Sequence, residues 1–228
     1  TNDKGQFSVT LPPGVLRAYV VPDDPSLALT QASLTLDAFA GTQSGKTLVV
    51  NPRSHVTGRV LLPDGTPVYA ADVVVGPSAD APFSSDDPHL RPRESSGTTD
   101  TEGRFDVLSD SGLVDVSVRP HDGTRLPWVV LVNRLVPPNI PSDAGAPSGL
   151  ALGDVLVKLP TPFTQSLAPG ILVDTAAKPL PYTLVRAYSF PSAIVVDGGA
   201  TLPRGARLIG STVTDASGAF QLYLLPPE

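Results

Sequence analysis

The 228-residue chain contains no cysteine and no methionine, and it has a single tryptophan. The absence of cysteine excludes disulfide bonds, thiolate nucleophiles, thioesters and cysteine-ligated zinc. No run of 18 apolar residues is present, so the sequence predicts no transmembrane helix. Basic residues are few, 16 against 22 acidic ones, and they are scattered. Binding to nucleic acid or to an anionic membrane surface is therefore not expected, because both need a clustered positive face.

Apolar residues are nevertheless plentiful, at 41% of the chain, and they suffice for real hydrophobic cores. The chain also holds 26 prolines and 20 glycines, spread along its length. Prolines and glycines at such short intervals divide a sequence into short segments, which suits strands and turns far better than helices. An all-β protein of more than one small domain is expected.

One seven-residue pattern, Thr-(Asp/Asn)-x-x-Gly-x-Phe, occurs three times, at residues 1–7, 99–105 and 214–220. The Asp or Asn is expected to accept hydrogen bonds from the backbone of its own turn. The Gly is expected to take the left-handed conformation that closes a hairpin. After each Phe, apolar residues alternate along the chain, which is typical of a half-buried strand. Further along, Val114, Val116 and Val118 are predicted to face inward on one more strand.

Two landmarks give the length of the repeat. Gly58 and Gly170 each stand nine residues before a proline that opens the next strand, and they lie 112 residues apart. The turn glycines Gly103 and Gly218 lie 115 residues apart. Two independent landmarks with nearly the same period indicate tandem copies of one module.

The period predicts three modules. Residues 1–52 are expected to form the C-terminal half of a first module, 53–160 a complete second module, and 161–228 a third that lacks its end. The linkers 51–54 and 160–162 are short and contain proline, which favours semi-rigid spacing. We therefore expect the modules to be arranged as a rod.

The second module carries, in order, the segments Val56-Thr57-Gly58-x-Val60, Asp64-Gly65-Thr66-Pro67-Val68, Ala71-x-Val73 and Thr99-Asp100-x-x-Gly103-x-Phe105. Together they resemble the carboxypeptidase regulatory-like domain family. The resemblance covers residues 53–160 throughout, the third module to its end and the second half of the first. The third module departs at Pro181 and Tyr182 and lacks the Asp-Gly turn.

This resemblance implies tandem Greek-key β-sandwiches of the transthyretin-like (prealbumin-like) or Ig-like kind, with about seven strands each. It implies bacterial modules that are extracellular or attached to the outer membrane or cell surface, beside peptidases, adhesins or receptors. It does not imply catalysis. In the zinc carboxypeptidases the domain follows the catalytic one and binds no metal.

No catalytic residue, cofactor site or metal site is predicted. The histidines His55, His89 and His121 have no His or Glu at metal-ligand spacing, and no Gly-x-Ser-x-Gly elbow is present. Acidic clusters such as Asp86-Asp87 lack the spaced order of a calcium loop. Solvated turns are therefore expected there, with structural calcium as the alternative. A Lys–Asn or Lys–Asp isopeptide bond is not expected either, because the second module has only Lys158, near its last strand.

Two long loops, 76–97 and 189–210, fall at equivalent positions of the second and third modules. Loops at one end of a sandwich often carry the binding function. Trp128 is expected to pack in the core or between sheets, because valines follow it; stacking on a sugar is the alternative. The possible binding residues are Phe83, Asp86, Asp87, His89, Arg91, Trp128, Phe190 and Arg207.

Three functions compete. The favoured one is a non-catalytic structural, spacer or adhesive segment of a bacterial surface or secreted assembly. Its partners would be other modules of the same protein or neighbouring chains. The alternative is a module that binds a glycan or a protein and is appended to an extracellular enzyme. An enzymatic role would need a buried His–carboxylate pair, which the sequence does not display.

Overall fold

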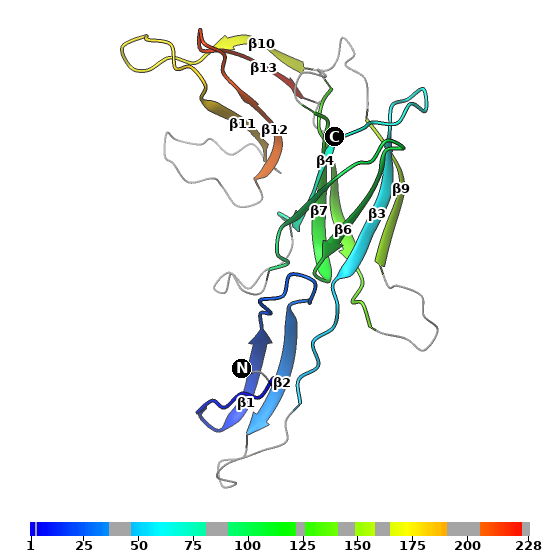
Figure 1. Ribbon diagram of the computed structural model, residues 1–228. Helices are drawn as coiled ribbons and strands as arrows, with labels where there is room; N and C mark the ends of the chain where they lie inside the picture. The colour runs from blue at the N-terminus through cyan, green and yellow to red at the C-terminus, as the bar shows by residue number, and fades with distance from the viewer. Residues whose placement is uncertain are drawn as a thin grey trace.

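The computed structural model describes residues 1–2, 4–36, 47–80, 91–121, 126–140, 149–157, 165–190 and 206–224, with the side chains of 165–169 left out. These residues form strands β1 to β13, and the described ranges contain no helix (Figure 1). The all-β class expected from the sequence is confirmed.

The centre of the molecule is a sandwich of two sheets. Its strands are β3 (Ser54–Leu61), β4 (Asp72–Pro77), β5 (Ser95–Thr98), β6 (Arg104–Ser109), β7 (Gly112–Arg119), β8 (Val129–Val136) and β9 (Gly149–Leu156). One sheet has the order β6-β3-β9 and the other β5-β4-β7-β8. The pairs are antiparallel except β3 and β9, which run parallel. Because the chain changes sheet repeatedly between consecutive strands, this is the expected Greek-key β-sandwich.

The core between the two sheets is built mainly from valine. Every second residue of a strand points inward, and the inward positions here are β-branched or aromatic, which fit a pleated surface. Val114, Val116 and Val118 of β7 are each 0% exposed, so their predicted inward orientation is confirmed. Burying one such side chain contributes about 1.5–3 kcal/mol.

A strand pair lies beyond one end of this sandwich, at the bottom of Figure 1. It consists of β1 (Gly14–Val20) and β2 (Thr30–Leu36), which are antiparallel. Gly14 begins β1 with φ 132°, and Gly112 begins β7 with φ 127°. Since the two strands open with the same unusual backbone and carry the same inward pattern, β1–β2 corresponds to β7–β8.

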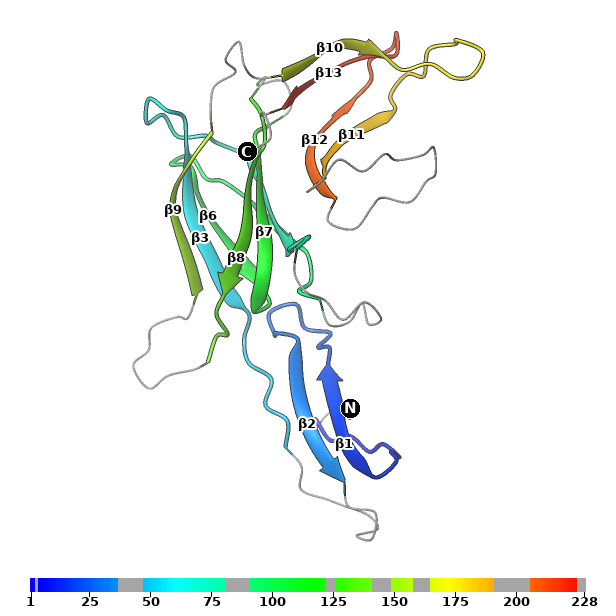
Figure 2. The same cartoon turned by 180° about the vertical axis from the view of Figure 1, so that it is seen from behind.

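Two more strand pairs lie beside the opposite end of the sandwich, as Figures 1 and 2 show from both sides. In one, β10 (Gln165–Ile171) pairs with β13 (Ala219–Leu224); in the other, β11 (Leu184–Ser189) pairs with β12 (Arg207–Val213). They correspond to β3 with β6 and to β4 with β5. The boundaries 1–52, 53–160 and 161–228 stay a prediction, and we call these parts the first, second and third modules.

The repeated turn has one geometry in all three copies. Its glycines, Gly5, Gly103 and Gly218, have φ of 71°, 75° and 76°. Asp100 Oδ1 accepts hydrogen bonds from the amides of Glu102 and Arg104, at 2.9 and 2.8 Å. Asn2 and Asp215 accept the equivalent pairs in the other copies. The predicted roles of the acidic or amide residue and of the glycine are confirmed.

The third module keeps a further turn although it lacks the Asp-Gly sequence. Ala177 stands where the second module has Gly65, and it takes the same left-handed conformation, with φ of 62° against 86°. Its amide donates to Asp174 O at 3.0 Å, as that of Gly65 donates to Leu62 O at 2.9 Å. The backbone therefore follows the repeat even where the residue type does not.

The Phe of the repeated pattern packs on a glycine of the neighbouring strand. Gly58 lies opposite Phe105, and a Cβ built on Gly58 would come within 2.7 Å of the Phe105 ring. Gly170 and Phe220 repeat the arrangement, with an even closer approach. The glycine of one repeated motif thus contacts the phenylalanine of the other in both modules.

Candidate functional site

A buried carboxylate joins the first module to the second. Asp110 lies in the turn between β6 and β7, and its side chain is 3% exposed. It accepts hydrogen bonds from Arg93 Nε at 3.0 Å, from Arg93 Nη2 at 2.9 Å and from the Arg93 amide at 2.9 Å. The amide of Leu29, in the first module, donates to it as well, at 3.0 Å. A two-pronged guanidinium–carboxylate pair of this kind fixes orientation as well as charge.

Arg93 also reaches across to the loop between β1 and β2. Its Nη2 donates to Leu27 O at 2.5 Å and its Nη1 to Pro22 O at 3.3 Å. Arg53 adds a second set of contacts: its amide donates to Ser26 O at 2.8 Å, and its Nε lies 3.4 Å from Asp110 Oδ1. We call these contacts of Arg53, Arg93 and Asp110 with residues 22–29 the first junction.

The electrostatics of the first junction favour the charged forms of Asp110 and Arg93. Burial alone would raise the pKa of Asp110, but the hydrogen bonds from Arg93 and Leu29 and the charge of Arg53 together lower it below its ordinary value. The hydrogen bond to Asp110 raises the pKa of Arg93. Burial lowers the pKa of Arg53, and the nearby charge of Arg93 adds to this, while Asp110 opposes it. One carboxylate therefore separates two arginines that would otherwise repel each other.

An arginine also joins the third module to the second. Arg207, at the start of β12, donates from Nε to Asp115 Oδ2 at 3.2 Å and pairs through Nη2 with Asp80. Arg93 lies just before β5, the counterpart of β12, so in both cases an arginine at the start of this strand holds the preceding module. We call the two ion pairs of Arg207 the second junction.

Asn133 positions the two carboxylates of the second junction. It has φ 54°, and in this conformation its amide donates to Asp115 Oδ1 at 2.9 Å. Its Nδ2 donates to Asp80 Oδ2 at 3.0 Å, and its Oδ1 accepts from Ser78 Oγ at 2.5 Å. The hydrogen bond from Asn133, followed by that from Arg207, lowers the pKa of Asp80. A left-handed asparagine is uncommon, and here it serves the contact between modules.

The guanidinium of Arg119 covers one face of the Trp128 ring. The Cζ of Arg119 lies 4.4 Å from the centre of the Trp128 ring, and both residues are partly buried. Burial lowers the pKa of Arg119; Glu94 and Asp72 oppose this, and the charge of Arg186, in the third module, adds to it. A like charge of the third module therefore acts on a guanidinium of the second module.

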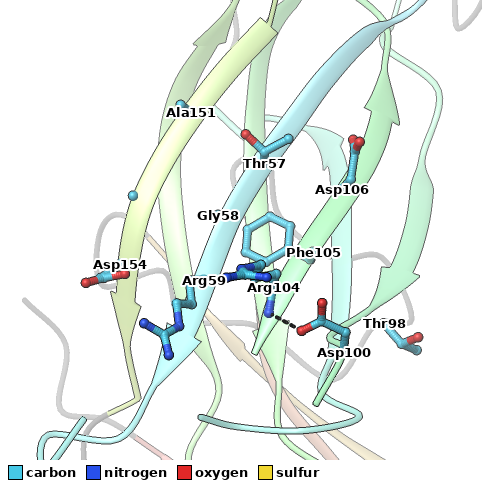
Figure 3. A pocket seen from close by; sticks show the side chains of 11 residues that line it. Thr57, Gly58, Arg59, Thr98, Asp100, Arg104, Phe105, Asp106, Ala151 and Asp154 are labelled. Atoms are coloured by element: carbon cyan, nitrogen blue, oxygen red, sulfur yellow. Dashed lines mark hydrogen bonds between the residues drawn. The ribbon is translucent and has the colours of Figure 1, made fainter. Parts of the chain in front are cut away.

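An open hollow of about 570 Å³ lies on the outer face of the sheet β6-β3-β9 (Figure 3). Its lining mixes both charges, from Arg59, Arg104 and Asp106 among others. Arg104 pairs with Glu102 at 3.0 Å, and Arg59 donates to the carbonyl of the same residue at 2.9 Å. The lining of this hollow therefore presents charges of both signs rather than a field of one sign.

The described residues also show no cluster suited to metal or acid–base chemistry. No group of three or more His, Asp or Glu side chains in the described ranges is placed to hold a metal ion. His55 pairs with Asp106 at 2.7 Å, but these side chains are 42% and 55% exposed, which is unlike a buried catalytic base. No long apolar helix able to cross a bilayer occurs in the same part of the chain.

The candidate residues proposed from sequence have different positions in the structure. Phe83, Asp86, Asp87 and His89 lie outside the described residues. Arg91 is exposed, and Phe190 is partly buried just after β11. Arg207 is found in the second junction. The structure thus does not bring the described candidates together into one site.

Sequence reasoning did not identify Asp110, although one signal was present. In the first module the equivalent position is Pro12, so Asp110 interrupts the repeat at a point where the fold needs no charge. An aspartate in one module at a turn position where another module has proline indicates a role specific to that module.

Comparisons with known proteins give only weak similarities. A scan against protein-family models and a search of curated proteins both find no match. Among solved structures, a streptococcal ancillary pilin matches with 12% identity over 94% of this chain and 64% of its own, at a TM-score of 0.28. A mutant shaft pilin SpaA from Lactobacillus rhamnosus GG matches with 13% identity over 77% of this chain and 83% of its own, at 0.27.

A 9R-lipoxygenase from Cyanothece PCC8801 matches with 17% identity over 50% of this chain, at a TM-score of 0.27. The chain spans 18% of that lipoxygenase and, as stated, 64% of the ancillary pilin. At such scores neither fold detail nor function passes from these proteins to this chain.

Proposed function

We propose that the chain is a non-catalytic structural segment of a bacterial surface or secreted assembly, built from tandem modules of the carboxypeptidase regulatory-like kind. The observation that carries this proposal is the first junction. Asp110 accepts from the Leu29 amide, and Arg53 and Arg93 donate to backbone carbonyls of residues 22–27. These charge-assisted hydrogen bonds connect consecutive modules. Such a connection fixes the angle between modules, which is the property that a stalk or fibre needs.

The contacts of the first junction suit a fixed angle for a physical reason. Rotating the modules apart would separate Asp110 from the Leu29 amide and the two arginines from the backbone carbonyls of residues 22–27. A buried charged group that loses a hydrogen-bond partner costs about 1–3 kcal/mol or more. The partners of Arg53 and Arg93 in the first module are backbone carbonyls, which side-chain motion cannot displace. A flexible connection between modules would not require these hydrogen bonds.

The surroundings of Trp128 do not favour the alternative of a glycan-binding module. Trp128, the aromatic residue best suited to a sugar, is partly buried and covered by Arg119. We assign the chain an extracellular or cell-surface location, with other modules of the same protein or neighbouring chains as partners.

Distance measurements between the first two modules test the proposal. Because the chain has no cysteine, single cysteines can be introduced for spin labels at two exposed positions, Ser33→Cys on β2 and Ala151→Cys on β9. We expect one narrow distance distribution between the labels. Asp110→Asn should broaden it, whereas Asp106→Asn, an exposed aspartate away from the junction, should not. A broad distribution in the unmodified chain would contradict the structural role.

A further inference from the structure

The two junctions use the same ionic chemistry, but their carboxylates lie at different depths. The carboxylate of the first, Asp110, is 3% exposed. Those of the second, Asp115 and Asp80, are 13% and 39% exposed. Salt reaches and screens partly exposed ion pairs, whereas buried ones are screened much less.

The two junctions also differ in what accompanies the ion pairs. In the first, backbone groups of both modules bond directly: the Arg53 amide donates to Ser26 O at 2.8 Å. This bond joins uncharged groups and does not depend on ionic strength. The second junction, as defined above, consists of ion pairs of the Arg207 side chain alone.

A repulsion between like charges opposes docking of the third module. Arg186 on β11 lies close enough to Arg119 on β7 for its charge to act on that guanidinium. Separation of the third module from the second would relieve this repulsion while breaking the pairs of Arg207. The attraction and the repulsion are both electrostatic and partly exposed, so their balance is small and adjustable.

We propose that the second junction is a reversible, salt-dependent docking contact, while the first junction stays closed. At low ionic strength Arg207 holds the third module against the outer face of β5-β4-β7-β8. At high ionic strength the third module leaves that face. This inference rests on the proposed structural role and adds to it one fixed and one adjustable connection.

Two label pairs on the full chain separate the two junctions. Ala151→Cys with Ser33→Cys reports on the first junction, and Ala151→Cys with Thr175→Cys, in an exposed turn of the third module, reports on the second. Between 50 mM and 1 M NaCl we expect the docked population of the second pair to fall roughly tenfold, since the screening length shrinks from above 10 Å to about 3 Å. The first pair should keep its narrow distribution.

Variants identify the residues responsible. Arg207→Gln should give the high-salt distribution of the second pair already at 50 mM NaCl. Arg104→Gln removes another arginine paired with a carboxylate, but away from both junctions, and should change neither pair. Far-ultraviolet circular dichroism of the full chain, together with the fluorescence of Trp128 in the second module, confirms that each variant is folded.

The outcomes are distinguishable. Suppose that neither salt nor Arg207→Gln changes the distance distribution of the second pair, while that of the first stays narrow. The proposal of a reversible junction is then wrong, and the proposed structural role still holds. If the second pair is already broad at 50 mM NaCl, the docking contact is wrong. If the first pair is broad at low salt, the proposed structural role itself fails.

Discussion

The hydroxyl of Thr99 donates a hydrogen bond to the carbonyl of Val68 at 2.6 Å, and it accepts one from the Ala71 amide at 2.9 Å. Thr99 is buried, and it begins the repeated turn pattern. In the third module Thr214 donates to Leu180 O at 2.7 Å and accepts from the Thr183 amide at 2.8 Å. The threonine of the pattern thus links two segments. It ties the start of the hairpin turn to the residues just before β4 in the second module and just before β11 in the third.

Thr99→Val should destabilise the second module by about 1–3 kcal/mol. Valine keeps the shape of the side chain, but it leaves the Val68 carbonyl and the Ala71 amide without a partner in a buried place. The neighbouring Thr98 is exposed, so Thr98→Val is the matched control and should stay within about 0.5 kcal/mol. Urea unfolding followed by Trp128 fluorescence measures both. Equal effects of the two substitutions would contradict this role of Thr99.

Gly58→Ala should destabilise the same module by about 1–3 kcal/mol, because the new methyl group would overlap the Phe105 ring. Replacing the ring as well, in Gly58→Ala with Phe105→Leu, should cost less than the sum of the two single changes. A double-mutant cycle in urea measures this coupling. Additive effects would show that Gly58 is not conserved in the repeat for the sake of the ring.

The local features of the fold could be predicted from sequence because they depend on neighbours in the chain. The turns around Gly103 and Gly218 and the inward face of β7 follow from residue type and period alone. The role of Thr99 could not be predicted, because its partners stand 31 and 28 residues earlier. The parallel pairing of β3 with β9 is likewise a long-range contact that no local pattern encodes.

The candidate site was predicted less well, again for a physical reason. The sequence predicts Arg207 as a possible binding residue of a long loop. In the structure it begins β12 and pairs with Asp80 and Asp115 of the preceding module. Asp110 looks in the sequence like an ordinary turn aspartate. Only the burial of its turn against the first module, which depends on how modules meet, reveals that it joins them.

Ala177→Gly should stabilise the third module by about 0.5–1 kcal/mol. Ala177 has φ 62°, a conformation that costs a residue with a Cβ roughly 1–2 kcal/mol, and glycine removes that cost at the expense of some chain entropy. The reverse change at the equivalent position, Gly65→Ala, should destabilise the second module by about 1 kcal/mol. Thermal unfolding of each variant gives the signs. Two shifts in the same direction would contradict the equivalence of the two turns.

Asp110→Asn should lower stability at pH 7 by about 3 kcal/mol, because it leaves Arg53 and Arg93 buried together without a counter-charge. The pKa of Asp110 is lowered in the folded chain, so its contribution is fully present above the pKa of the unfolded carboxyl and is lost as pH falls through the folded one. The difference between the unmodified chain and the variant should therefore be constant above about pH 5 and shrink below about pH 4. Urea unfolding at pH 7, 5 and 3.5 measures it, with Asp106→Asn as the exposed control. A difference that grows towards low pH would mean that Asp110 is not the charged partner of the two arginines.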